Sequence, residues 1–127
     1  MKYEPRKSFA QRLDEMDAET KNYYKEVEKT FTENPGVKAR TSLRCVTFRH
    51  QKDVLGKVAL GGKTLKLYLA MDPNESMLKD GKYHPRDLSQ TKAYELVPTM
   101  LPIKSDVALR KAKSAIQYVV LRKIFNF

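Results

Sequence analysis

The segment spanning residues 64–71 constrains the fold most, because apolar and polar side chains alternate along it. Every second position is apolar, and the positions between are polar or small: Leu65, Leu67, Leu69 and Met71 against Thr64, Lys66, Tyr68 and Ala70. A strand has a side-chain period of two, so these two sets lie on opposite faces of a sheet. We therefore predict a strand that buries its leucines and turns Lys66 and Tyr68 outward.

The triplet Gly62-Lys63-Thr64 at the start of this strand has a second interpretation, the end of a phosphate-binding loop. Such a loop follows the pattern G-x-x-x-x-G-K-[ST] and leads into a helix whose N-terminus faces the phosphates. Here the first required glycine is replaced by Lys57, and a strand pattern follows the triplet. The Gly61-Gly62 pair between two apolar runs instead favours a two-residue hairpin turn.

Helical spacing predicts two helices near the N-terminus and one at the C-terminus. Ser8 and Asp17 are suitable N-caps for the first two, and Asn34-Pro35-Gly36 ends the second. Ser105 and Asp106 begin the last helix, in which one stripe is expected to be buried: Leu109, Ala112, Ile116, Val119 and Val120. Residues 1–7 show no periodicity, so we expect them to fray.

Between these helices the pattern changes to strands, at residues 41–50 and 54–60. In the first, alternation places Arg44, Val46 and Phe48 on one face, and we expect Phe48 to join Lys66 and Tyr68 on the outside. Cys45, on the other face, is expected to be a small buried core residue. Residues 73–92 form a loop with at most a short helical turn. Two prolines in residues 95–104 permit only an edge strand or an extended segment.

Together these elements predict a single α+β domain over residues 1–127. We expect a two-layer sandwich, in which an antiparallel meander sheet of three to four strands packs against the N-terminal helices and the C-terminal helix. The chain of 127 residues contains no apolar run near the roughly 20 residues that span a bilayer. One cysteine cannot form an intramolecular disulfide, and the first residues lack the apolar stretch of a secretory signal. We therefore expect a cytoplasmic protein without a membrane partner.

The net charge of +10 is unevenly distributed along the chain. Residues 37–72 carry eight basic and two acidic side chains, and residues 105–127 carry five and one, whereas residues 1–36 carry seven and eight. Segregated positive charge of this size attracts polyanions. The candidate binding residues are therefore the cations of these two regions and one interleaved aromatic: Lys38, Arg40, Arg44, Arg49, Lys57, Lys63, Lys66, Tyr68, Arg110, Lys111 and Lys113.

Cations that neutralise phosphates, with aromatic rings for base stacking, are typical of a nucleic-acid-binding surface. No RNP motif, GXXG loop, zinc finger or paired DNA-reading helix is recognisable, so we predict binding without sequence specificity. The alternative is an adaptor or structural domain whose basic face docks on an acidic protein partner. His50 and His84 are the only histidines, and we expect both to be exposed. We predict no catalysis, no metal and no cofactor.

Short motifs run along nearly the whole chain: RKSF at 6–9, YY at 23–24, VKAR at 37–40, GKTLKLYLAMDP at 62–73, VP at 97–98 and IKS at 103–105. In this order they resemble a family of small, uncharacterised bacterial domains, similar to the YdhG/YjbR/CyaY-like folds. The resemblance implies an α+β fold. Within that class it implies DNA binding in the YjbR branch and iron binding through an acidic surface in the frataxin branch. A basic middle and end fit DNA binding better than iron binding.

Overall fold

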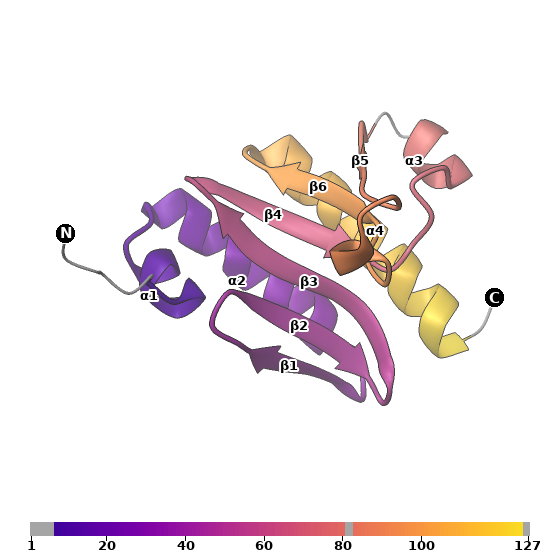
Figure 1. The fold of residues 1–127 in the computed structure, drawn as a ribbon, viewed down its shortest axis with the longest axis horizontal. Coiled ribbons are helices and arrows are strands. Elements are labelled where there is room, and N and C mark those ends of the chain that lie inside the picture. The colour runs from indigo at the N-terminus through magenta and orange to yellow at the C-terminus, as the bar shows by residue number, and fades with distance from the viewer. Residues whose placement is uncertain (1–6, 81–82, 126–127) are drawn as a thin grey trace.

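The computed structural model describes residues 7–80 and 83–125, and these form an α+β fold (Figure 1). The helices are α1 (Phe9–Asp14), α2 (Ala18–Thr32), α3 (Ser76–Asp80) and α4 (Asp106–Phe125), with a short 3-10 helix, η1 (Lys92–Tyr94). The strands are β1 (Val37–Thr41), β2 (Cys45–His50), β3 (Asp53–Gly61), β4 (Thr64–Leu69), β5 (Arg86–Asp87) and β6 (Thr99–Ile103). They pair in the order β1-β2-β3-β4-β6-β5, and every pair is antiparallel.

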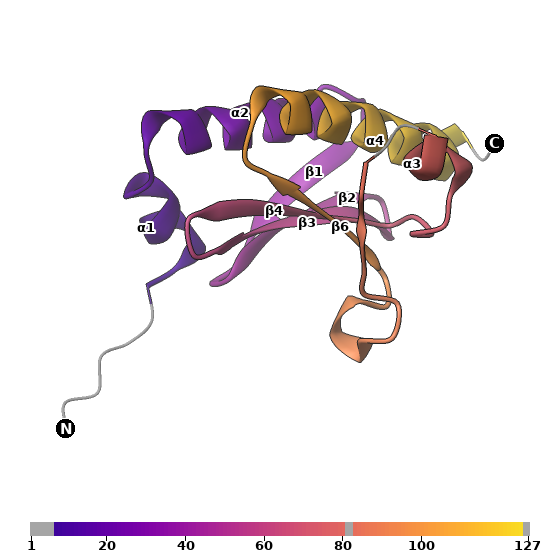
Figure 2. The same cartoon turned by 90° about the horizontal axis from the view of Figure 1, so that it is seen from above.

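The two faces of this sheet have different surroundings (Figure 2). Helices α2 and α4 lie along one face, here called the inner face, where the strands bury their apolar side chains: Val46, Phe48, Val58, Leu65, Leu67, Leu69, Leu101 and Ile103. The opposite, outer face carries the segment of residues 88–98, which includes η1, over β4 and β6. The predicted burial of the β4 leucines is confirmed, as is the buried stripe of α4.

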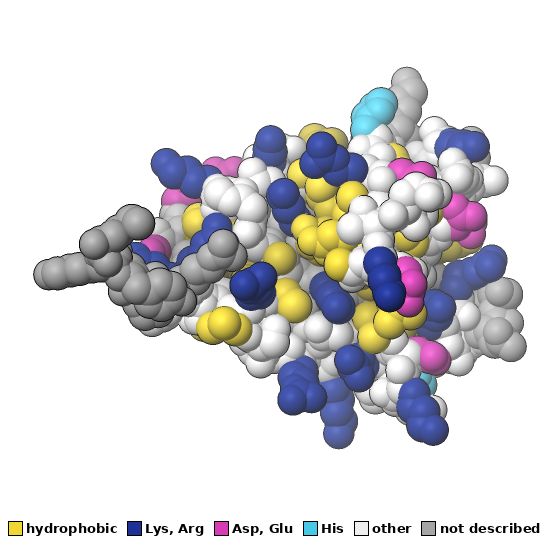
Figure 3. Space-filling model, viewed as in Figure 1, with side chains coloured by type: hydrophobic (Ala, Val, Ile, Leu, Met, Phe, Trp, Pro, Cys, Tyr) yellow, Lys and Arg dark blue, Asp and Glu magenta, His cyan; other side chains and the backbone are white. Residues whose placement is uncertain are grey.

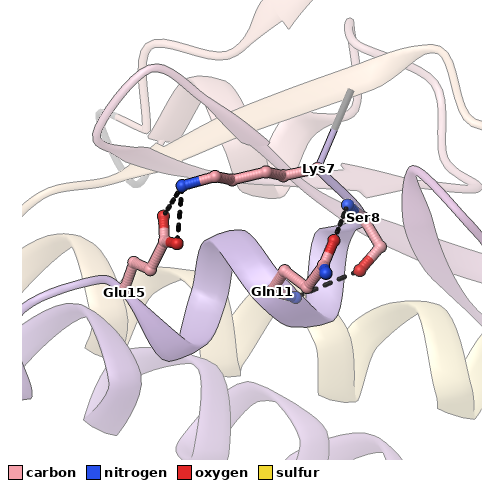
Figure 4. Close-up of polar contacts among 4 residues, drawn as sticks. All are labelled: Lys7, Ser8, Gln11 and Glu15. Atoms are coloured by element: carbon pink, nitrogen blue, oxygen red, sulfur yellow. Dashed lines mark hydrogen bonds and ion pairs between the residues drawn. The ribbon is translucent and has the colours of Figure 1, made fainter. Parts of the chain in front are cut away.

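Both N-terminal helices begin where their capping residues predict. At α1 the Gln11 backbone N–H donates to Ser8 Oγ (3.2 Å) and the Ser8 N–H donates to Gln11 Oε1 (2.8 Å), which is a capping box (Figure 4). Asp17 accepts from the Thr20 backbone N–H (2.7 Å) and caps α2. Residues 1–6 of the expected frayed segment lie outside the described residues, while Lys7 is paired with Glu15.

The sheet has six described strands, so the prediction of three to four is wrong. Residues 41–50 do not form one strand, because β1 ends at Thr41 and a turn separates it from β2. Strand β1 is an edge strand of five residues with only Val37 buried, so its pattern is short and adds one strand to the prediction. Strand β5 has two residues and is too short to show any period.

The prolines in residues 95–104 predict an edge strand or an extended segment. Strand β6 instead lies between β4 and β5. Strand β5 pairs only with Thr99 and Met100 of β6. Pro102 lies beyond this short pairing, so its missing N–H removes no ladder hydrogen bond on that side. Because β5 is only two residues long, Pro102 has no neighbouring strand on that side within the described chain. At this position β6 therefore resembles an edge strand.

The structure reverses the predicted facing of β2. Phe48 was expected outside, but it is fully buried and its ring stacks on that of Phe31 in α2, with centroids 4.2 Å apart. Gly56 pairs with Phe48 across the sheet, and a Cβ added there would lie 2.9 Å from the Phe31 ring. Because glycine has no Cβ, Gly56 leaves room for the stacked rings of Phe31 and Phe48. Cys45 was expected in the core and instead lies half-buried on the outer face.

The segment around Gly62-Lys63 is a hairpin turn between β3 and β4, as predicted. Gly61 pairs with Thr64, so the two-residue loop is Gly62-Lys63, one position later than the Gly-Gly pair suggested. Gly62 has a φ of 63°, whereas Lys63 does not have a positive φ, which is the pattern of a type II′ turn. The Arg12 guanidinium donates to the carbonyls of Leu60 (3.0 Å) and Gly62 (3.1 Å), so α1 is attached to this hairpin.

Candidate nucleic-acid interface

Six cationic side chains share the outer face of the sheet, because directly paired residues of neighbouring strands point to the same side. Lys38 of β1 pairs with Arg49 of β2. A series of cross-strand pairs leads from Arg40 of β1 to Lys57 of β3 and on to Arg86 of β5. We call the six the outer-face cations: Lys38, Arg40, Arg49, Lys57, Lys66 and Arg86. Among the paired strand positions of the described chain, no Asp or Glu lies on this face. Figure 3 shows Lys and Arg side chains spread across it with hydrophobic side chains between them.

One row of paired residues crosses all six strands. It runs from β1 to β5 and contains three cations and three uncharged side chains, in the order Arg40, Thr47, Lys57, Tyr68, Met100 and Arg86. Neighbouring strands are spaced about 4.8 Å apart, so the five steps from Arg40 to Arg86 cover about 24 Å. The other three outer-face cations, Lys38, Arg49 and Lys66, lie beside this row, and the positive charge therefore extends over the width of the sheet.

A small apolar cluster lies between Lys57 and Arg86 on the same face. Its buried members are Tyr68, Val97 and Met100. The Tyr94 ring from η1 stacks on Tyr68, with centroids 4.8 Å apart and planes inclined by 3°. Burial, with a smaller contribution from the Tyr94 hydroxyl, raises the pKa of Tyr68 to about 12. Tyr68 thus lies on the outer side as predicted, but only 8% of its surface is exposed, and half-buried Tyr94 covers it.

A shallow cavity of about 390 Å³ lies over β1 and β2 at one side of the outer face. Lys38, Arg40 and Arg49 line it, together with Gly36, Ala39, Thr47 and Gln51. Three cations without a carboxylate in the lining favour occupation by an anionic group. This cavity is the part of the outer face where positive charge is most concentrated.

The remaining predicted residues lie elsewhere. Arg44 is exposed in the β1–β2 turn and Lys63 in the β3–β4 turn, and these two turns lie at the same end of the antiparallel sheet. The α4 residues lie in the helical layer behind the sheet. There Lys113 forms an ion pair with Glu26 (3.2 Å) and the Lys111 ammonium lies 5.8 Å from the centre of the Tyr83 ring, whereas Arg110 is exposed. The eleven predicted residues therefore do not form one surface.

Two residues of the outer face were missed by the sequence analysis, Arg86 and Tyr94. Both come from segments between the predicted strands, where a two-residue strand and a three-residue 3-10 helix produce no periodic pattern. Pro85, immediately before Arg86, indicates only a break in regular structure.

A second cavity, of about 450 Å³, combines three carboxylates, those of Asp53, Asp72 and Glu75, with Arg122 and Lys123. Tyr118 donates to Glu75 Oε2 (2.9 Å), and this hydrogen bond raises the pKa of Tyr118. Carboxylates outnumber cations by three to two in this lining, so it does not favour a polyanion. Among the described residues, no group of His, Cys, Asp and Glu side chains is arranged to hold a metal ion.

The histidines are placed differently from each other. His84 is exposed, as expected, but His50 is half-buried and its ring lies close to Gly36, where an added Cβ would approach it to 3.1 Å. In the part of the chain that the structure describes, no helix has the length and apolar character needed to cross a bilayer.

Comparison of this chain with protein-family models, with curated proteins and with solved structures finds no match. The resemblance to small bacterial domains therefore stays a prediction, as does the absence of catalysis. A function has to be inferred from the geometry and charge of the outer face itself.

Proposed function

We propose that this protein binds nucleic acid, without sequence specificity and without catalysis, through the outer face of its sheet. The observation that carries the proposal is the strand register, which aligns the six outer-face cations on one side. No acidic residue interrupts them at the paired strand positions that the structure describes. Among the described residues, none of the six outer-face cations forms an ion pair, so their charge is available to a ligand.

Binding of this kind is driven by release of the counterions that condense on a phosphate backbone. Each neutralised phosphate contributes about −0.9 to the slope of log affinity against log salt for duplex DNA, and about −0.7 for single strands. With four to six phosphates engaged, the expected slope is roughly −3 to −5. A surface of scattered, paired charges would give a much smaller slope.

The lack of sequence specificity follows from the kind of contact. Base recognition requires donors and acceptors held in fixed positions against base edges, commonly on a helix that enters the major groove. The outer-face cations are long side chains on a sheet, and α4 packs its apolar stripe against the opposite face. Such contacts fit the repeating phosphates rather than the bases.

The test is a titration of labelled random DNA and RNA at several salt concentrations, followed by fluorescence anisotropy. We expect binding at low salt that weakens steeply as salt is added. Absence of binding at low salt, or affinity that stays flat over a several-fold change in salt, would contradict the proposal. A stoichiometric protein partner that persists after nuclease treatment of a pull-down would instead support docking on an acidic protein.

A further inference from the structure

We infer that the nucleic acid bound on the outer face is a single strand, and that one of its bases stacks on Tyr94. The inference rests on the proposed function and narrows its ligand class. It depends on three features of the described chain: an apolar centre between the cations, the Tyr94 ring stacked on Tyr68, and the length of the cation row.

The centre of the outer face is apolar where a duplex would need positive charge. Between Lys57 and Arg86 the row passes through Tyr68 and Met100, both buried under the 88–98 segment. A duplex exposes phosphates along its whole outer surface, so an apolar centre would meet charge without neutralising it. A single strand exposes its bases, which can stack on the segment that covers this centre while phosphates reach the cations on either side.

Tyr94 is positioned to take such a base. One face of its ring is covered by Tyr68 in a parallel stack, and the side chain is only half-buried, so part of its surface stays open to a ligand. The backbone of Tyr94 is held by hydrogen bonds from its N–H to Thr91 O (3.0 Å) and from Val97 N–H to its carbonyl (3.0 Å), while the stack on Tyr68 holds the ring. A ring fixed before binding loses little conformational freedom when a base stacks on it.

The ends of the segment that carries Tyr94 are tied together. The Leu88 N–H donates to Pro98 O (2.8 Å), which extends the short β5–β6 pairing and closes residues 88–98 into a loop. Leu96, two residues after Tyr94 in the same loop, exposes 63% of its surface. The loop thus places an aromatic side chain over the cation row and carries an exposed aliphatic one nearby in sequence.

The dimensions fit a short single strand. Lys57 and Arg86 are three strand spacings apart, about 14 Å, and the whole row measures about 24 Å. This length corresponds to the lower end of the roughly 4–16 nucleotides that single-strand-binding domains occupy. We therefore expect affinity to rise with oligonucleotide length only up to a few nucleotides beyond that lower end.

The experiment compares three labelled ligands of equal length by fluorescence anisotropy: oligothymidine, an abasic strand with the same number of phosphates, and a duplex. We expect oligothymidine to bind about tenfold more tightly than the abasic strand, the size of effect that one stacked base produces. Tyr94→Ala should remove that difference and leave the salt slope unchanged. Tyr94→Phe, which keeps the aromatic face, should behave as the unaltered protein.

The outcomes separate the inference from the proposed function. If the abasic strand or the duplex binds the unaltered protein as tightly as oligothymidine, and all weaken steeply with salt, the single-strand inference is wrong and the proposed function stands. If none of the three binds at low salt, both are wrong. The ligand comparison uses the unaltered protein, so it remains decisive even if Tyr94→Ala fails to fold. If Tyr94→Ala does not fold, Tyr94→Leu is used to remove the aromatic face.

Discussion

The inner and outer faces of the sheet are made by the same strands but have opposite chemistry. On the inner face, Leu65, Leu67 and Leu69 of β4 are fully buried against the helical layer. On the outer face, Lys66 of the same strand lies with Lys57 and Arg86 in a positively charged surface. Side chains alternate along a strand, so neighbouring residues lie on opposite faces. One of them stabilises the fold, and the next one faces the ligand.

This difference teaches that stability and binding should be separable by substitution. Removal of an inner-face side chain should lower the free energy of unfolding without altering the charge that a ligand meets. Removal of an outer-face cation should do the reverse. The following predictions test that separation, from the largest expected effect to the smallest.

Phe48→Ala should have the largest effect on stability. The side chain is fully buried and stacks on Phe31, so its removal should lower the free energy of unfolding by about 3–5 kcal/mol, measured by urea denaturation. Thr47→Ala, one position away on the outer face, is the matched control and should change it by less than about 1 kcal/mol. Equal losses for the two variants would break the distinction between the faces.

The double variant Arg40→Gln with Lys57→Gln should weaken nucleic-acid binding at low salt by at least about tenfold. It removes two phosphate contacts, so the magnitude of the salt slope should decrease by roughly 1.4–1.8. Its urea midpoint should stay close to that of the unaltered protein, because surface substitutions have small effects on stability.

The control for this pair is Arg110→Gln with Lys123→Gln, which removes the same charge from exposed positions of α4. We expect its salt slope to remain unchanged. A control that weakens binding as much as the outer-face variant would show that net charge, and not the outer face, determines affinity.

Gly62→Ala should destabilise the protein by about 1–2 kcal/mol. The position has a φ of 63° with open space around it, so the cost comes from the backbone conformation and not from a clash. Gly61→Ala is the comparison, since an added Cβ there meets only the flexible end of Lys66 and should cost less. Urea denaturation that ranks the two variants in the opposite order would contradict the assigned turn.

The smallest predicted effect concerns the N-cap of α2. Hydrogen bonds from the Thr20 backbone N–H and hydroxyl lower the pKa of Asp17 below its ordinary value of 3.8. A carboxyl whose pKa is lowered by folding contributes stability above its ordinary pKa and loses it as pH falls through the lowered value. Asp17→Asn should therefore flatten the dependence of the melting temperature on pH below about 4. An unchanged pH dependence would show that this cap is not charge-assisted.

The alternation over residues 64–71 was sufficient to predict which side of β4 is buried, because a period of two over a whole strand has one interpretation. The same reasoning was wrong for Phe48, since nothing in residues 41–50 distinguishes its two faces by polarity. Arg44 and Val46 share a parity, but Arg44 lies in the β1–β2 turn, which contains no glycine or proline to mark it. The facing of β2 depends on contacts outside this segment, such as the stacking of Phe48 on Phe31 of α2.

The candidate site was predictable in composition but not in position. Charge counts identified residues 37–72 as basic, and most of those cations do lie on the outer face. The cations of α4 were grouped with them although α4 packs behind the sheet, because net charge carries no information on direction. Arg86 and Tyr94 were missed for the opposite reason, since their placement depends on pairing with β6 and stacking on Tyr68.

The most direct measurement is a map of the bound surface by NMR, with isotope-labelled protein and oligothymidine added at low salt. The account predicts that resonances of the outer-face cations and of Tyr94 shift in proportion to ligand, while those around Arg110 and Lys111 in α4 stay in place. Shifts concentrated on α4, with the outer face unchanged, would contradict it.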